Sequence, residues 1–306
     1  MAVSAPDAGR RAGPRCPNPG RGPGSGNLAL VPKLSDVVTV LERVYRPEWA
    51  ETWDAVGLVC GDPDADVRSV MFAVDPTLAV AEEALARGAD LLITHHPLFL
   101  RGVHSVAATG FKGRVVHRLI TGGCALHVAH TNADSAAPGV SDALAAAIGL
   151  TVTAPLDVAP GDPDGCRGIG RIGTLPAPEP LAAFAERVAR ALPSTATGLR
   201  VAGDPTRPIH TVAVCGGAGD SLFDAVRRSG ADAYVTADLR HHPASEALEH
   251  GGPALVDAAH WATEWPWLAH AADELTRALA ASGATVETHV SELVTDPWTF
   301  HTARGA

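Results

Sequence analysis

Apolar and polar positions follow two different patterns along this chain from about residue 34 onward. Short continuous apolar runs, typical of strands buried on both faces, alternate with segments in which apolar residues recur every three or four positions, as on one face of a helix. Strands are predicted at 67–75, 89–94, 125–130, 211–215, 233–236 and 254–258. Helices are predicted at 34–44, 78–88, 111–121, 141–148, 181–192, 221–229, 243–250 and 265–282. This alternation predicts an α/β fold in which parallel or mixed sheets are covered by helices.

The division of the chain into domains is predicted from breaks in this pattern. The segment 151–168 contains many Pro, Gly and Asp residues and shows no periodicity, which indicates a domain boundary. We therefore expect a first domain at 33–155, a second at 156–290 and a C-terminal tail at 291–306. Residues 1–32 are rich in Gly, Pro, Arg and Ser, which predicts a disordered tail because little apolar surface can be buried there. A misassigned start codon would explain this segment as well.

Composition and charge narrow the class of protein. A length of 306 residues with 46% apolar content is enough for two domains with real cores. The net charge of −10 disfavours a protein that tracks a phosphate backbone, so a nucleic-acid partner is not expected. The five cysteines lie far apart without a C-x-x-C pair, so no disulfide framework is indicated and a reducing cytoplasm fits best. The sequence shows neither a membrane-spanning apolar run nor a secretory signal.

Candidate metal ligands follow three of the predicted strands. His95 and His96 come directly after one apolar run, Asp134 follows the next, and a later run is followed by His260 and Glu264. Ligands of doubly wound sheets bind beyond the carboxyl ends of the strands, so these five side chains are predicted to share one site. Three imidazoles and two carboxylates suit zinc, iron or manganese and are too rich in nitrogen for calcium.

Each of these residues has a simpler interpretation when taken alone. An isolated pair of histidines often caps a sheet or is solvated, and an Asp in a polar turn suits an Asx turn or an N-cap. The spacing of His260 and Glu264 would put both on one face of a helix. Alternatively, Thr263 and Pro266 look like the N-cap and first-turn residues of a helix that begins near Glu264. Either geometry lets the pair reach one metal cluster, and the joint placement of all five favours the metal site.

Five motifs, in this order, resemble those of the NIF-three-like family, whose members are commonly labelled GTP cyclohydrolase I type 2 homologues. They are Trp-Asp-Ala-Val-Gly-Leu (53–58), Thr-His-His-Pro-Leu-Phe (94–99), Ala-His-Thr-Asn-Ala-Asp (129–134), Val-Cys-Gly-Gly-Ala-Gly (214–219) and Ala-His-Trp-Ala-Thr-Glu (259–264). The resemblance covers roughly residues 34 to 290, and motif order over such a span is specific. Departures from the family pattern occur at Ala55, Ala133 and Trp261, and every ligand position is filled.

The resemblance implies two interlinked α/β domains with a dinuclear metal site in the cleft between them, often within a toroidal homohexamer. Carried over residue by residue, His96 and Asp134 would bind one metal, His95 and His260 the other, and Glu264 would bridge both. Longer members of the family carry an inserted middle domain. The gap between residues 150 and 170 is too short to hold one, so this chain is the compact form.

Two function classes follow from such a site. Two metals about 3.5 to 4 Å apart lower the pKa of a bridging water and stabilise charge on the attacking and leaving oxygens. The first hypothesis is therefore a metal-dependent hydrolase that acts on a nucleotide or related small metabolite through a metal-bound water, with Glu264 as a candidate catalytic group. The family label implies GTP cyclohydrolase chemistry, which opens the guanine imidazole ring at C8. The alternative is a non-catalytic metal-binding scaffold for interaction or metal handling.

Two further motifs each keep two interpretations. His241 and His242 follow the strand at 233–236 and would serve either as substrate or proton-transfer groups or as a solvated pair. The glycines of 216–219 precede a predicted helix and would either cradle a phosphate through backbone N–H groups or form a tight turn. The motif lacks the Lys-Ser/Thr ending of a P-loop.

Overall fold

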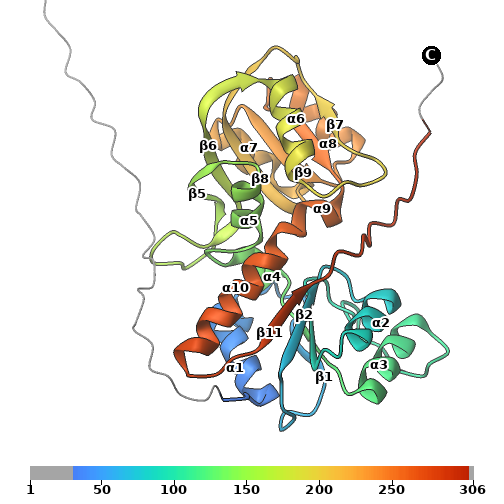
Figure 1. Cartoon of the computed structure of the whole chain (residues 1–306). Coiled ribbons are helices and arrows are strands. Elements are labelled where there is room, and N and C mark those ends of the chain that lie inside the picture. Colours follow the sequence, from blue (N-terminus) through green and yellow to red (C-terminus); the bar gives the residue numbers. More distant parts are fainter. Residues whose placement is uncertain (1–29, 303–306) are drawn as a thin grey trace, which may run out of the picture.

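The computed structural model describes residues 30–302 and shows two lobes, each built on one mixed sheet (Figure 1). The prediction of an α/β fold with mixed sheets covered by helices is confirmed. The disordered tail predicted at 1–32 lies almost wholly outside the described residues. Leu30, one of its last residues, forms an isolated parallel bridge with Ala284.

The first sheet has the strand order β1-β4-β3-β2-β11, and only β1 runs antiparallel to its neighbour. Its strands are β1 (Gly57–Cys60), β2 (Ser69–Ala73), β3 (Leu91–Thr94), β4 (Ala125–Val128) and β11 (Glu287–Val290). The helices of this lobe are α1 (Leu34–Val44), the 3-10 turn η1 (Pro47–Trp49), α2 (Leu78–Ala86), α3 (Phe111–Gly122), α4 (Thr131–Ser135) and α10 (Pro266–Ala281). Helical layers cover both faces of this sheet.

Alternation along the central strands explains the two layers. Val70 and Phe72 of β2 belong to the core on the side of α1 and α10, whereas Met71 lies between them and packs with α2 and α3. Ile93 and Leu92 of β3 divide in the same way. Because both faces are covered, these strands are apolar at every position, and this continuous run made them predictable.

The second sheet has the strand order β5-β6-β8-β9-β10-β7, in which β8, β9 and β10 form a parallel centre. Its strands are β5 (Thr151–Val158), β6 (Gly168–Pro180), β7 (Arg200–Ala202), β8 (Pro208–Ala218), β9 (Ala233–Ala237) and β10 (Ala254–Ala258). The helices here are α5 (Val140–Ala147), α6 (Leu181–Ala191), the 3-10 turn η2 (Asp220–Leu222), α7 (Phe223–Ser229), α8 (His241–Glu249) and α9 (His260–Glu264). Phe184 of α6 packs on one face and Val226 of α7 on the other.

The segment 151–168 differs from the sequence-based expectation. Its first half is strand β5, which pairs antiparallel with β6. Most residues of β5 are exposed, so the strand carries no apolar pattern. The domain ranges 33–155 and 156–290 stay a prediction. The strand pairing adds that β11 returns from the second lobe to pair with β2 of the first sheet.

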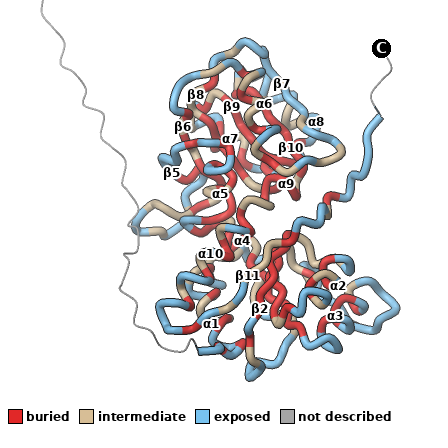
Figure 2. The backbone as a smooth tube through the Cα atoms, viewed as in Figure 1, coloured by how far each residue is buried: buried red, intermediate tan, exposed pale blue. Residues whose placement is uncertain are grey.

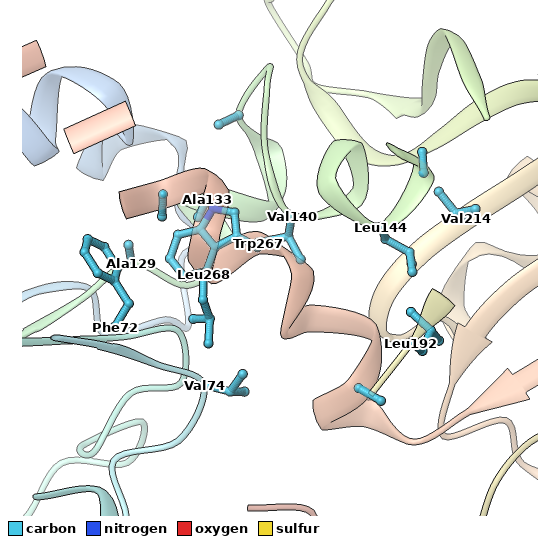
Figure 3. Packing of buried hydrophobic residues seen from close by; sticks show 14 of the residues in the cluster. Phe72, Val74, Ala129, Ala133, Val140, Leu144, Leu192, Val214, Trp267 and Leu268 are labelled. Atoms are coloured by element: carbon cyan, nitrogen blue, oxygen red, sulfur yellow. The ribbon is translucent and has the colours of Figure 1, made fainter. Parts of the chain in front are cut away.

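One hydrophobic core runs through both lobes. Figure 3 shows Phe72 of the first sheet and Val214 of the second at opposite ends of a row of packed side chains that includes Trp267 of α10. Trp267 is fully buried and donates a hydrogen bond from its indole nitrogen to the Tyr45 hydroxyl at 3.2 Å. Buried residues accordingly fill the centres of both lobes and the junction between them (Figure 2). Within 30–302, no helix combines the length and apolarity that crossing a membrane requires.

His127 on β4 makes folding stability depend on pH. The ring is 2% exposed, neither nitrogen has a hydrogen-bond partner, and burial lowers its pKa to about 4. The unfolded chain takes up a proton near pH 6.5, so this stabilisation is fully present above pH 6.5 and is lost as pH falls towards 4. Between pH 7 and pH 4.5, the free energy of unfolding should fall by about 2–3 kcal/mol more in wild-type protein than in His127→Leu. Urea unfolding at both pH values measures this difference.

The control is His117→Leu on the exposed side of α3, which should keep the wild-type difference between the two pH values. Equal acid sensitivity of His127→Leu and wild type would contradict the assignment.

Candidate metal centre

The ends of three strands meet between the two lobes. His95 and His96 directly follow β3, and Asp134 lies on α4, just after the neighbouring strand β4. His260 and Glu264 lie on α9, just after β10 of the second sheet. The structure brings all five predicted side chains together, although their positions span most of the chain.

Helix α9 resolves the two alternatives for the His-x-x-x-Glu pair. His260 and Glu264 are its first and last residues, and His260 Nε2 lies 2.9 Å from Glu264 Oε1. The interpretation of Thr263 as the N-cap of one long helix is wrong. Thr263 lies inside α9, and its hydroxyl donates to the His260 carbonyl at 2.7 Å. A separate helix, α10, begins at Pro266, as expected of a proline in a first turn.

Glu264 lies at the centre of the cluster and is 3% exposed. Its Oε1 lies 3.5 Å from His95 Nε2, and its Oε2 lies 3.1 Å from His96 Nε2. Asp134 Oδ1 approaches His95 Nε2 at 3.8 Å. The two oxygens of Glu264 therefore face different imidazoles, as the oxygens of a carboxylate shared by two ions would.

The far side of each ligand histidine is fixed by an acceptor. His95 Nδ1 lies 3.0 Å from the Ala129 carbonyl, and the Nδ1 atoms of His96 and His260 lie 2.7 Å from carboxylate oxygens of Asp75 and Asp238, respectively. A carbonyl or carboxylate accepts a proton from Nδ1, which leaves the Nε2 lone pair facing the cluster. Metal-binding histidines are oriented in this way.

Asp75 and Asp238 were not predicted from the sequence, although a signal exists. Asp75 follows β2, the parallel neighbour of β3, and Asp238 follows β9, the parallel neighbour of β10. In both cases, an aspartate that follows one strand is hydrogen-bonded to the histidine that follows the adjacent strand. Asp238 has φ of 57°, in the left-handed region that costs a non-glycine residue about 1 kcal/mol, and aspartate tolerates this conformation better than most residues.

A fourth histidine, His130, also lies in the cluster and was not among the ligands predicted from the sequence. Nitrogen atoms of His95, His96 and His130 lie within 4.8 Å of one another. Asp54 accepts from His130 Nδ1 at 2.8 Å and from the Thr131 backbone N–H at 3.0 Å. Although burial opposes it, these bonds hold the pKa of Asp54 well below its usual range. The Trp-Asp motif of 53–58 thus orients a histidine of the cluster.

The chemistry of the cluster fits a metal ion. His95 Nε2 is buried without a hydrogen-bond partner within the described residues, and His96, His260 and Glu264 form a group able to hold an ion. Burial lowers the imidazole pKa values, but Glu264 outweighs it and raises the pKa to about 10 for His96 and about 11 for His260. The same buried negative charge would attract a metal cation, which would compete with protons for the Nε2 atoms.

The glycines of 216–219 form the irregular end of strand β8, which packs against the cluster. The backbone N–H groups of Gly216, Gly217 and Gly219 donate to Ser141 Oγ, Thr263 Oγ1 and the Ala237 carbonyl. These donors are therefore already used, and the phosphate-cradle interpretation is wrong. A Cβ at Gly217 would lie 2.5 Å from Glu264 Oε1, which explains why a glycine stands there. His241 and His242 are exposed at the start of α8, outside the cluster.

A pocket of about 640 Å³ opens on the cluster. Its lining includes His96, His260, Arg200 and residues 295–298. Two of the candidate metal ligands, His96 and His260, therefore line a space that a small molecule can enter.

Comparison of the sequence with known proteins gives a consistent result. The family model described as Duf34/NIF3 (NGG1p interacting factor 3) matches residues 32–297. A "GTP cyclohydrolase 1 type 2 homolog" of Streptomyces coelicolor is 57% identical over 273 residues, which cover 89% of this chain and 96% of that protein. A Mycobacterium bovis protein of the same name is 40% identical over an alignment covering 87% of this chain and 96% of that protein.

Solved structures share the fold. A Staphylococcus aureus hypothetical protein superposes with a TM-score of 0.80 at 28% identity, over 88% of this chain and 99% of that one. A Bacillus cereus protein related to NIF3 gives a TM-score of 0.81 at 24% identity, over 89% of this chain and 100% of that one. The two-lobed α/β arrangement is thus the arrangement of known proteins.

Proposed function

The chain belongs to the Duf34/NIF3 family, and from this premise we propose that it binds two divalent metal ions in the histidine–carboxylate cluster and hydrolyses a nucleotide or related metabolite. The observation that carries the proposal is the pocket of about 640 Å³ whose wall includes His96 and His260. Ligand pockets of enzymes commonly have volumes of about 300–1,000 Å³. A purely structural metal site needs no such access.

The proposed ligand set follows the chemistry of the side chains. His96 and His260 would hold one ion and His95 and Asp134 the other, with Glu264 shared between them, because His96, His260 and Glu264 form one group and Asp134 lies beside His95. The distances thus favour a different pairing from the one that the resemblance implies. Zinc, iron or manganese suit this mixed nitrogen and oxygen set. When bound, two such ions supply Lewis acidity and lower the pKa of coordinated water.

The residues of the chain contribute orientation and charge. Asp75 and Asp238 hold the rings of His96 and His260 so that each Nε2 faces the cluster. Glu264 is buried, so its charge acts in an environment with little water to screen it. Arg200, which also lines the pocket and is paired with Asp257, would offer its guanidinium to an anionic group of the substrate.

The names of the relatives support a nucleotide substrate, because they are called homologs of GTP cyclohydrolase 1 type 2. The non-catalytic scaffold is the alternative, and the toroidal homohexamer and the cytoplasmic location stay predictions. The accessible pocket favours the enzyme.

Glu264→Gln tests the proposal. We expect wild-type protein purified without chelator to contain about two metal equivalents per chain, and the variant to contain about one or fewer, because the shared carboxylate is lost. Turnover of a panel of nucleotides and phosphoesters should fall about a hundredfold or more. Elemental analysis and product detection by chromatography measure the two effects.

The matched control is Glu186→Gln, whose side chain is 73% exposed on α6 and should behave as wild type. A wild-type protein that holds two metals but converts no member of the panel would favour the scaffold. If wild-type protein contains one metal equivalent per chain or none, and Glu264→Gln contains the same amount, the cluster does not bind metal as proposed.

A further inference from the structure

The segment that follows β11 crosses from the first lobe to the second (Figure 1). At its start, the Ser291 backbone N–H donates to the Phe72 carbonyl at 2.8 Å, and its carbonyl accepts from the Trp265 indole at 2.9 Å. Further on, the Thr295 hydroxyl donates to the Asp75 carboxylate, and the ring of His301 is hydrogen-bonded to the Ala196 carbonyl. Held at both ends, this segment contributes residues 295–298 to the wall of the pocket beside the cluster.

Asp296 in this wall has an unused acceptor. The residue is 8% exposed, and its Oδ2 is buried without a hydrogen-bond partner among residues 30–302. Burial raises the pKa of this carboxyl, although a hydrogen bond from the Trp298 backbone opposes the shift, and the charges of Asp238 and Asp75 raise it further. Leaving a carboxylate oxygen desolvated and unpaired is costly, so its persistence in a pocket wall indicates a donor that arrives with a ligand.

Two other groups of the same pocket define what that ligand carries. Trp298 is 66% exposed and offers an aromatic surface two residues beyond Asp296. Arg200 donates from Nε to Asp257 at 2.7 Å, and its Nη2 donates to the same carboxylate and to the Leu239 carbonyl. Its Nη1 makes no hydrogen bond within the described residues. An N–H acceptor, an aromatic surface and a guanidinium thus share one pocket with the metal cluster.

We propose that Asp296 is a specificity residue that accepts a hydrogen bond from a ring N–H or amino group of a nucleotide base. In this arrangement the base stacks on Trp298 and the phosphate pairs with Arg200. A simple amine would also donate to Asp296, but Arg200 and the metal ions would repel its positive charge, whereas an anionic nucleotide satisfies all three groups. The inference rests on the proposed function for the reaction, yet it concerns binding and is tested separately from turnover.

Two nucleotides that differ in base donors provide the test. GMP carries a ring N–H and an amino group, whereas purine riboside 5′-monophosphate has the same ring system and phosphate without either. Calorimetric titration of metal-loaded wild-type protein should show GMP binding about tenfold tighter or more, because a hydrogen bond to a charged acceptor is worth at least one factor of ten. The ratio of the two affinities is the measured quantity.

Variants of the wall should change this ratio in a graded way. Asp296→Asn should lower the preference to about threefold, because a neutral acceptor gives roughly half the hydrogen-bond strength. Asp296→Ala should abolish the preference. Trp298→Ala should weaken both nucleotides about tenfold without changing their ratio, since stacking does not depend on base donors. Without nucleotide, Asp296→Asn should melt at a higher temperature than wild type, because it removes a buried unpaired charge.

The matched control is Glu292→Gln, an exposed acid on the same segment, which should keep the wild-type ratio. Equal affinity of the two nucleotides for wild type, no binding of either, or an unchanged ratio in Asp296→Asn would overturn the inference. Preference for GMP without any turnover would leave the inference standing and count against the hydrolase. Turnover of nucleotides without a preference for GMP would support the hydrolase and overturn the inference.

Discussion

Gly217→Ala is expected to weaken metal binding about a hundredfold, although Gly217 is not a ligand. The residue has φ of +69°, and an added Cβ would lie 2.5 Å from Glu264 Oε1 and 3.0 Å from His260 Nε2. Neither neighbour can retreat easily, because Glu264 is buried and the His260 ring is held by Asp238. The methyl group would therefore displace both ligands. Calorimetric titration of metal-free protein with Zn²⁺ or Mn²⁺ measures the change.

Gly230→Ala is the matched control for backbone strain. Gly230 also has φ of +69°, but an added Cβ would meet no atom within 4 Å. Both variants should lose about 1–2 kcal/mol of stability from the left-handed conformation, and only Gly217→Ala should lose metal affinity. Wild-type metal affinity in Gly217→Ala would show that the ions do not use Glu264 and His260.

Arg171→Met is expected to cost about 3–5 kcal/mol of folding stability. Arg171 is 1% exposed and donates at 2.7 Å to the carbonyls of both Gly168 and Gly170. Its other terminal nitrogen lies 2.7 Å from the Asp142 carboxylate and also donates to the Ala136 carbonyl, just beyond the helix α4 that carries Asp134. Removing the guanidinium leaves several buried acceptors unpaired. Urea unfolding at pH 7 measures the loss.

Arg187→Met provides the comparison, because Arg187 is 40% exposed and pairs with Glu179 at 2.7 Å. It should cost about 1 kcal/mol or less, as exposed ion pairs do. The double variant Arg171→Met/Asp142→Leu should recover part of the loss, since it removes the unpaired carboxylate. A loss no larger than that of Arg187→Met would contradict the structural role of Arg171.

The strands that could be predicted from the sequence are those at the centres of the sheets. β2 and β9 are buried at every position, so their continuous apolar runs are visible without any structure. β7 and β11 lie at sheet edges, and β5 is largely exposed, so their residues are free to be polar. Their places depend on which strand they pair with, and local patterns do not encode that choice.

The candidate site divides in a similar way. His95, His96, Asp134, His260 and Glu264 could be predicted because each follows an apolar strand or belongs to a motif of the chain. The residues that orient the rings were not predicted, because the acid after one strand can be matched with the histidine after another only when the order of the strands is known. Asp54, for example, binds His130 from 76 positions away. Adjacent parallel strands bring such residues together, and strand order becomes known only with the sheet.

The position of β11 bears on how the protein is made. Glu287 of this strand pairs with Ser69 of β2. That side of β2 therefore has no partner strand until the whole second lobe has been synthesised. At about 5–20 residues per second, that interval lasts on the order of ten seconds or more on the ribosome. During it, β2 presents an open apolar edge of the kind that recruits strands from other chains. A nascent chain therefore gains protection against aggregation late, when β11 emerges and closes that edge.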